Sequence, residues 1–283
     1  MAELRQEAGP ALTRRLSPAD VADLLERHGL APRKQAGQNF VGDPNTVEAI
    51  VADVDIGPQD TVVEIGPGLG SLTLALADAA ERVVAVEIDS GLVGALAEVV
   101  GDRDDVVVHH ADAMESDLGA LAGGPFRLVA NLPYNLATPM VFHALEDPAA
   151  IDAYVMVQKE VGKRWAASPG DDLYAGVSVK LQLFADVEVR RSISRQVFTP
   201  IPRVDSVMVH LVRRHDLDPW LREVVDAAFA QRRKTLRNTL QAVADVAVVE
   251  AALDDLGLAH TARAEELPPA TFVDLAARLR TDT

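Results

Sequence analysis

The sequence contains no cysteine. This absence excludes disulfide bonds, thiolate metal sites and a cysteine nucleophile. Long apolar runs are missing too, because Asp or Arg interrupts every apolar stretch well before the roughly 20 residues that a membrane span needs. The start, Met1-Ala2-Glu3, has no apolar segment of the kind found in signal peptides. We therefore expect a cytoplasmic protein without a membrane segment.

Positive charge is also scarce, since 27 Lys and Arg face 43 Asp and Glu, for a formal net charge of −16. This balance argues against a protein that simply coats nucleic acid, because phosphate binding relies on Lys and Arg. The basic residues nevertheless concentrate between Lys159 and Arg237, whereas acids crowd residues 43–117 and 241–283. Charge alone leaves two interpretations open, an RNA-binding surface and a set of solvated faces.

The chain is long enough for one full-sized core and a smaller second unit, with 283 residues of which 48% are hydrophobic. Ser17, followed by Pro18 and Asp20, is a typical helix start and predicts a short helix that ends near His28. We predict three parts: an N-terminal extension with this short helix over residues 1–30, a main domain over 31–215 and a helical domain over 216–283.

Strands and helices alternate regularly from Thr61 onward. Runs of Val and Ile predict strands, and the segments between them predict helices; the strands are 61–65, 82–87, 106–109, 126–131 and 154–157, and the helices 69–80, 92–100 and 140–145. Such strands mean a parallel sheet covered on both faces. Two further runs, 187–194 and 204–212, predict an antiparallel hairpin at the sheet edge, and residues 220–283 carry helical apolar spacing, as in Leu236, Leu240, Val243 and Ala247. The predicted fold class is α/β, a doubly wound Rossmann-like sheet with a small C-terminal all-helical domain.

A glycine-rich turn, Glu64-Ile65-Gly66-Pro67-Gly68-Leu69-Gly70-Ser71, follows the first of these strands. Glycine lets the backbone approach a ligand, and ligands of doubly wound sheets bind at the carboxyl ends of the strands. The next strand ends at Glu87, about twenty residues on, where a carboxylate can accept both hydroxyls of a ribose. The pair predicts a nucleoside-containing cofactor without identifying it, although Ser71 departs from the nicotinamide fingerprint. Asp112, after the third strand, is either an acceptor for an adenine amino group or a surface acid.

The fourth strand ends in Asn131-Leu132-Pro133-Tyr134, the N-x-P-Y tetrapeptide of amino-directed methyltransferases. An adenine amine is a poor nucleophile because its lone pair is delocalised into the ring. If the Asn131 side-chain oxygen and the Leu132 carbonyl accept its two N–H bonds, the lone pair is directed at the methyl donor. Pro133 turns that carbonyl into the pocket, and Tyr134 offers a face on which the target base stacks. The alternative is an Asn-Pro turn with a buried tyrosine.

From about Arg33 to Leu279 the sequence resembles the ribosomal RNA adenine dimethyltransferase family. The matching segments are Gly37-Gln38-Asn39-Phe40-Val41, Glu64-Ile65-Gly66-Pro67-Gly68-Leu69-Gly70, Glu87-Ile88-Asp89, Asn131-Leu132-Pro133-Tyr134-Asn135, Gln158-Lys159-Glu160-Val161, Phe198-Thr199-Pro200-Ile201-Pro202-Arg203-Val204-Asp205-Ser206 and Arg232-Arg233-Lys234-Thr235-Leu236-Arg237-Asn238. The tail before Ser17 is a departure from the family, as is Gln35-Ala36 in place of the usual Ser-Leu.

The resemblance implies S-adenosylmethionine as the cofactor and assigns roles to particular residues. The implied cofactor contacts are Asn39 and Val41 at the methionine end, Gly66 and Gly68 at the turn, Glu87 on the ribose, and Asp112 and Asn131 near the adenine and the methyl group. Target-base stacking falls to Tyr134 and Phe198. Independently of the resemblance, the concentration of basic residues leads us to predict RNA contacts at Lys159, Lys163, Arg164, Arg232, Arg233, Lys234 and Arg237. On a helix, Arg233 and Arg237 would share one side and form a cationic ridge.

The implied function is methyl transfer to the N6 amines of two adjacent adenines in a small-subunit ribosomal RNA hairpin during ribosome biogenesis. The expected partner is ribosomal RNA in the small subunit or its precursor. We expect a monomer, and no metal, because the seven histidines show no metal-ligand spacing.

Three alternative functions stay open. One is an antibiotic-resistance methyltransferase that modifies large-subunit ribosomal RNA. The small-subunit branch of the family is favoured by two segments, Asn135-Leu136-Ala137-Thr138-Pro139 and Arg232–Asn238. Another is a non-catalytic RNA-binding assembly factor, although such a factor has no physical reason to keep Gly66, Glu87, Asp112 and Asn131 together. The last is a small-molecule methyltransferase, which predicts neither a basic span nor an appended helical domain.

Overall fold

The computed structural model describes residues 15–32, 38–133 and 136–280, which divide into two compact units. The first unit takes the described residues up to Lys159 together with Val189–Val212. The second takes Glu160–Glu188 and the described residues from Arg213 onward. The second unit therefore includes residues 160–188, which the sequence analysis assigns to the main domain, and the domain limits stay a prediction.

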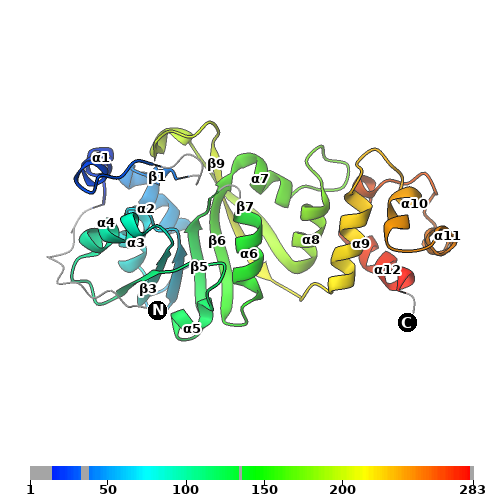
Figure 1. Ribbon diagram of the computed structural model, residues 1–283, viewed down its shortest axis with the longest axis horizontal. Coiled ribbons are helices and arrows are strands. Elements are labelled where there is room, and N and C mark those ends of the chain that lie inside the picture. The colour runs from blue at the N-terminus through cyan, green and yellow to red at the C-terminus, as the bar shows by residue number, and fades with distance from the viewer. Residues whose placement is uncertain (1–14, 33–37, 134–135, 281–283) are drawn as a thin grey trace. The chain divides into compact units, whose positions relative to one another are not determined.

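A seven-stranded sheet organises the first unit, with the strand order β4-β3-β2-β5-β6-β9-β7 (Figure 1). The strands are β2 (Thr61–Ile65), β3 (Arg82–Glu87), β4 (Val106–His110), β5 (Phe126–Asn131), β6 (Ala150–Gln158), β7 (Ala185–Ile193) and β9 (Ser206–Arg213). β2 to β6 pair in parallel, and β9 pairs antiparallel with β6. The predicted α/β sheet is confirmed, and of its two late strands it is β9 that lies next to β6, with β7 outside it.

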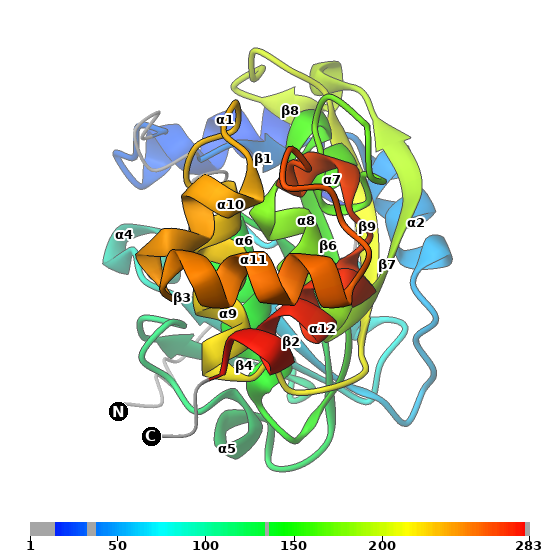
Figure 2. The ribbon, with the colours of Figure 1, turned by 90° about the vertical axis from the view of Figure 1, so that its right-hand side faces the viewer.

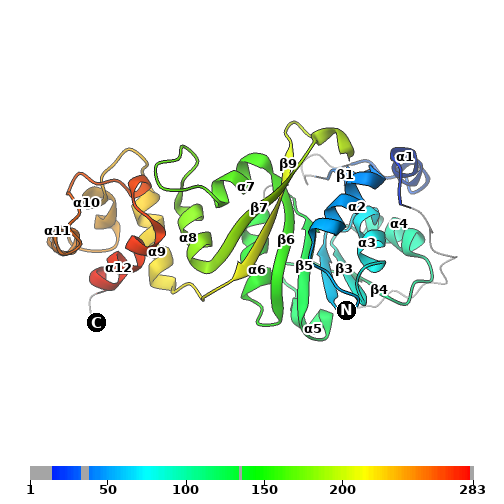
Figure 3. The ribbon, with the colours of Figure 1, turned by 180° about the vertical axis from the view of Figure 1, so that it is seen from behind.

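Helices cover both faces of this sheet. They are α2 (Pro44–Asp53), α3 (Ser71–Ala77), α4 (Ser90–Val100), α5 (Leu118–Ala122) and α6 (Ala137–Glu146). Figure 1 shows α6 on the near face, whereas Figure 3, seen from behind, shows α2 on the opposite face. The strands between these layers are apolar and buried, as a doubly covered sheet requires. The helix α2 was not predicted from the sequence, although Asp43 caps it and Pro44 begins it.

The short helix α1 (Pro18–Arg27) forms as predicted. The Ser17 hydroxyl accepts a hydrogen bond from the Asp20 backbone N–H, and the Asp20 carboxylate accepts one from the Ser17 N–H at 2.8 Å. These bonds satisfy amides that a helix start otherwise leaves open. Val21 and Leu24 pack in one cluster with Phe40. The helix is therefore part of the core of the first unit.

A second, two-stranded sheet joins two segments that are far apart in the sequence. β1 (Phe40–Val41) pairs antiparallel with β8 (Phe198–Thr199), with Phe40 opposite Thr199 and Val41 opposite Phe198. The Gly42 N–H donates to the Val197 carbonyl at 2.9 Å and extends this contact. Strands of two residues have no periodicity, so the sequence did not predict this pairing.

The second unit is helical, as Figure 2 shows for α9 to α12. Its helices are α7 (Lys159–Trp165), which starts one residue before the unit, α8 (Gly176–Phe184), α9 (Pro219–Phe229), α10 (Leu236–Thr239), α11 (Val246–Asp255) and α12 (Pro269–Leu279). The apolar spacing from Leu236 to Ala247 does not belong to one helix, because a 3-10 turn (Leu240–Ala242) follows α10 and Asp245 is the N-cap residue of a new helix. Within the described residues, no helix is both long and apolar enough to cross a membrane.

Candidate active site

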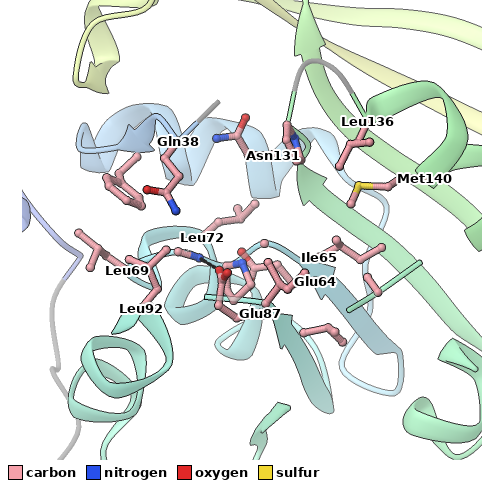
Figure 4. Close-up of a pocket in the computed structure, with 18 of the residues that line it drawn as sticks. Gln38, Glu64, Ile65, Leu69, Leu72, Glu87, Leu92, Asn131, Leu136 and Met140 are labelled. Carbon is pink, nitrogen blue, oxygen red and sulfur yellow. Dashed lines mark hydrogen bonds between the residues drawn. The ribbon is translucent and has the colours of Figure 1, made fainter. Parts of the chain in front are cut away.

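A cavity of about 380 Å³ opens at the carboxyl ends of β2, β3 and β5 (Figure 4). Its walls come from residues 38–41, from the turn after β2, from the end of β3 and from the segments after β4 and β5. Eight of the residues singled out from the sequence line it, namely Asn39, Val41, Gly66, Gly68, Glu87, Asp112, Asn131 and Pro133. The edge of the sheet at which ligands bind in doubly wound folds therefore carries one continuous site.

The glycine-rich turn forms the floor of this cavity. Gly66 and Gly68 have φ angles of 68° and 59°, a region that side-chain-bearing residues rarely adopt. A Cβ at Gly68 would lie 2.8 Å from two ring carbons of Phe40, whereas one at Gly66 would meet no atom within 4 Å. The Gly66 N–H donates to the Val86 carbonyl at 2.9 Å and ties the turn to β3. The backbone of Gly66 therefore faces the cavity with no side chain in between.

The Glu87 carboxylate is buried at the end of β3. One of its oxygens accepts a hydrogen bond from the Gly68 N–H at 3.2 Å, and the other accepts one from the Asp89 N–H at 2.9 Å. Burial raises the pKa of Glu87, against the lowering effect of these backbone bonds. Each oxygen keeps a further lone pair, so the held carboxylate can accept two ligand hydroxyls.

Glu64, for which the sequence predicted no role, also lines this cavity. It is buried, and the Thr73 hydroxyl donates to its Oε2 at 2.6 Å. Burial raises the pKa of Glu64 to about 8, with the nearby Glu87 adding to the shift. Glu64 therefore carries a proton near neutral pH. The available signal was an acid inside an otherwise apolar strand, Thr61-Val62-Val63-Glu64-Ile65.

Ser71 adds a polar atom to the cavity wall. Its Oγ is buried and has no hydrogen-bond partner among the described residues. Leaving a buried hydroxyl unpaired is costly, so such an atom next to a cavity indicates a ligand that supplies the missing bond.

Asn131 ends β5 with its side chain held by a specific contact. Its Nδ2 donates to the Asn39 backbone carbonyl at 3.0 Å. Because a carbonyl oxygen can only accept, the amide nitrogen must face Asn39, and Oδ1 is left as the acceptor for another group. The Leu132 N–H donates to the Met156 carbonyl at 3.1 Å, which fixes the strand end. Tyr134 lies outside the described residues.

The segment after β4 and the end of β3 supply a different kind of wall. One Asp112 oxygen accepts a hydrogen bond from the Met114 N–H at 2.8 Å, and its side chain is half-buried. Ile88, for which the sequence predicted no role, lines the same cavity with a side chain that is 63% exposed. An acid beside an open apolar surface fits a flat ring that carries an amino group.

Phe198 is 1% exposed and packs in the main core of the first unit. The stacking role expected for it is not supported, because its ring lies within this core and keeps almost no exposed surface.

The basic residues do not form the expected ridge. Residues 230–235 lie outside any helix, in bends and a turn. Arg237 lies on the four-residue helix α10, which begins at Leu236. Arg233 and Arg237 therefore share no helix, and Arg237 pairs with Glu250. The other expected RNA contacts also differ among themselves: Arg164 pairs with Glu160 and Arg232 with Glu265, whereas Lys159, Lys163, Arg233 and Lys234 make no ion pair within the described part of the chain.

A family model described as Ribosomal RNA adenine dimethylase matches residues 29–281. The chain belongs to this family. The resemblance expected from the sequence is thus confirmed, and the protein is a ribosomal RNA adenine methyltransferase. Among residues 15–32, 38–133 and 136–280, no three His, Cys, Asp or Glu side chains come together in a group that could hold a metal.

Other members and solved structures agree with this family. The Ribosomal RNA small subunit methyltransferase A of Streptomyces griseus is 49% identical over 275 residues, 92% of this chain and 94% of that protein. The crystal structure of the 23S rRNA methyltransferase ErmE has a TM-score of 0.65 at 29% identity and covers 85% of this chain and 99% of its own. A dimethyladenosine transferase from Plasmodium falciparum has a TM-score of 0.69 at 24% identity, covers 82% of this chain and 94% of its own, and shares the fold.

Proposed function

We propose that this protein transfers methyl groups from S-adenosylmethionine to the N6 amines of two adjacent adenines in small-subunit ribosomal RNA. The Streptomyces griseus relative, 49% identical, is named for the small subunit, whereas ErmE, named for 23S rRNA, is 29% identical. The higher identity supports the small-subunit substrate over the large-subunit alternative. A cytoplasmic monomer acting on the subunit or its precursor is part of the proposal.

One observation carries the chemistry, the hydrogen bond from Asn131 Nδ2 to the Asn39 carbonyl at 3.0 Å. It leaves Oδ1 as an acceptor at the carboxyl end of β5, beside the cavity. The Glu87 carboxylate lies in the same cavity at the end of β3, which is separated from β5 by β2. A target amine needs an acceptor of this kind, because each N–H that is held fixes the direction of the nitrogen lone pair.

The cavity fits S-adenosylmethionine by the chemistry of its walls. Glu87 offers two fixed oxygens to the ribose hydroxyls, and Asp112 with Ile88 offers an acceptor and an apolar surface to the adenine. The unpartnered Ser71 hydroxyl is buried in the same wall. The cofactor supplies an electrophilic methyl group when it is bound.

The protein's own residues position the acceptor and exclude water. We propose that Asn131 Oδ1 and the Leu132 carbonyl accept the two N–H bonds of the target amine, and that the buried Leu132 side chain keeps this end of β5 rigid. Pro133 turns the chain after it, and its carbonyl accepts the Leu136 N–H at 3.0 Å. Tyr134 provides the face on which the adenine stacks. No strong base is required, because the methylated amine is far more acidic than the neutral one.

Lys163, Arg233 and Lys234 are exposed and make no ion pair within the described residues, so they are suited to contact phosphates. Lys159 is half-buried and likewise makes none. Arg164, Arg232 and Arg237 each pair with a glutamate and would have to exchange that partner for RNA. These seven residues are the RNA contacts of the proposal.

The test is transfer of labelled methyl groups from S-adenosylmethionine to purified precursor small subunits, to large subunits and to a mixture without RNA. We expect label in the small-subunit RNA alone, as N6-dimethyladenosine at two neighbouring positions after nuclease digestion and mass spectrometry. Asn131→Ala serves as the inactive control. Label in large subunits would support the resistance-type alternative, and no label in any RNA would refute the proposal.

A further inference from the structure

The segment between β8 and β9, residues 200–205, is held next to the candidate active site at both ends and is called the 200–205 loop below. At its start, β8 pairs with β1, whose residues Phe40 and Val41 line the cavity. At its end, Ser206 opens β9 opposite Gln158, on the strand that neighbours the one ending in Asn131. In Figure 1 the yellow-green ribbon beside β1 is this part of the chain.

The 200–205 loop exposes apolar side chains although its backbone is anchored. Ile201 is 64% exposed and Val204 is 43% exposed, while Pro202 between them is buried. Two large apolar side chains that point outward within four residues, next to a site that must receive a macromolecule, indicate an interaction surface.

The cations around this loop differ from most others in the first unit. Arg15, Arg27, Arg103, Arg127 and Arg191 all form ion pairs with carboxylates. Lys159, Arg195 and Arg203 form none within the described residues. Instead, Arg195 Nη1 donates to the Arg203 carbonyl at 2.9 Å, and the backbone N–H groups of Arg195 and Lys159 donate to the side chain and the carbonyl of Asp205.

Arg195 is therefore bonded to both Arg203 and Asp205 of the loop, and Lys159 to Asp205, which places the three cations on one connected segment. The lack of carboxylate partners is notable in a chain with a net charge of −16. Cationic groups that form no salt bridge within the described residues of so acidic a protein are suited to an anionic partner from outside.

We propose that the 200–205 loop contacts the RNA strand that flanks the target adenine. Ile201 and Val204 pack against the neighbouring bases where the adenine has left the stack, and Lys159, Arg195 and Arg203 contact the adjoining phosphates. Apolar side chains are used in this way by proteins that unstack bases, and an adenine whose amine is methylated must leave its stack. This inference rests on the proposed function, since it needs RNA as the substrate.

The apolar part is tested with the double variant Ile201→Ala/Val204→Ala. Ile151→Ala is the matched control, because Ile151 is 42% exposed at the start of β6, the opposite end of the strand from Gln158. Burying one CH₂ group changes an equilibrium constant by about fourfold, so we expect kcat/KM on precursor small subunits to fall by roughly tenfold or more. The control should retain wild-type kcat/KM, and the affinity for S-adenosylmethionine should be the same in all three proteins.

The charged part is tested by the double variant Lys159→Gln/Arg203→Gln. It leaves in place the backbone hydrogen bonds and the hydrogen bond from Arg195 Nη1 to the carbonyl of residue 203. Arg82→Gln is the control, since Arg82 also makes no ion pair within the described part of the chain but lies at the start of β3. Subunit binding should weaken, and the slope of log K against log salt should shrink by about one unit for each lost phosphate contact. The apolar double variant should keep the wild-type slope.

A photo-crosslinking amino acid at position 201 identifies what the loop touches. The expected product is a crosslink to small-subunit RNA within a few nucleotides of the methylated adenines, absent when the same group replaces Ile151. Crosslinking to a ribosomal protein, or no more crosslinking than at position 151, would overturn the inference.

The two proposals fail in different ways. If wild-type protein methylates no RNA, the proposed function fails. If it methylates small subunits and the Ile201 and Arg203 variants match their controls in kcat/KM and salt slope, the loop inference alone fails.

Discussion

Folding should raise the pKa of the buried Glu64 carboxyl group and so make the stability of the protein depend on pH. The substitution Glu64→Gln removes this one titrating group and tests the effect. Burial raises its pKa from an ordinary 4.5 to about 8, so the folded state binds a proton that the unfolded state has lost above pH 4.5. Its contribution to stability is therefore complete below about pH 4.5 and declines as the pH rises towards 8. Glutamine keeps the shape, and its side-chain oxygen can still accept the Thr73 hydroxyl.

The size of the effect follows from these two pKa values. Linkage gives a loss of about 2–3 kcal/mol from this one group between pH 5 and pH 7. The glutamine variant has no proton to bind at this position. Its free energy of unfolding, relative to that of the wild type, should therefore rise by about 2–3 kcal/mol between pH 5 and pH 7. Other carboxyl groups titrate equally in both proteins, so they cancel from the difference.

The assay is urea unfolding of the wild type, Glu64→Gln and the exposed control Glu81→Gln at pH 5, 6 and 7. The difference between wild type and Glu64→Gln should grow with pH, and the difference for Glu81→Gln should stay within about 0.5 kcal/mol. A Glu64→Gln difference that is constant across this range would show that Glu64 ionises normally in the folded protein, and the reasoning from burial would be refuted.

Three further predictions concern the cavity. Glu87→Ala should weaken S-adenosylmethionine binding by roughly tenfold to a hundredfold with the fold intact, and unchanged calorimetric affinity would remove Glu87 from the site. Asn131→Ala should lower kcat by about 10²–10³ with little change in the affinity of the donor-free protein for RNA; Tyr134→Ala should lower kcat less, and Tyr134→Phe very little, so an inactive Tyr134→Phe enzyme would contradict stacking. Gly68→Ala should destabilise the protein by about 1–3 kcal/mol, because it strains φ and presses on Phe40; an unchanged melting temperature would argue against this turn geometry.

The sequence was sufficient for the parts of the fold that repeat. Valine-rich strands separated by helices predicted the parallel sheet, and the predicted bounds of β2, β3 and β5 are those of the structure, whereas β6 begins at Ala150, four residues before its predicted start. The cavity residues were found for a related reason, since the carboxyl ends of adjacent parallel strands meet at one edge. Residues that follow different parallel strands in the sequence therefore come together at one edge of the sheet.

What the sequence missed depends on contacts between distant segments. Phe198 could not be recognised as a core residue from the sequence, because the two-residue strand that carries it has no periodicity and the cluster that buries it comes from distant segments. The broken helix after Leu236 was missed because apolar spacing continues across Asp245, where a new helix begins. The elevated pKa of Glu64 likewise depends on burial by neighbours that a local reading does not include.

The bond between Asn131 and the Asn39 carbonyl also connects two binding events. Asn39, Phe40 and Val41 line the cavity proposed for the methyl donor, and Asn131 is proposed to receive the acceptor amine. A donor that immobilises residues 39–41 also immobilises the carboxamide, so the acceptor loses less freedom when it binds second. Coupling of this kind is reciprocal: the factor by which the donor raises the affinity for RNA, typically about 5–150-fold, is the factor by which RNA raises the affinity for the donor. Asn131→Ala should bring both factors towards unity, and equal cooperativity in that variant would show that the two sites communicate by another route.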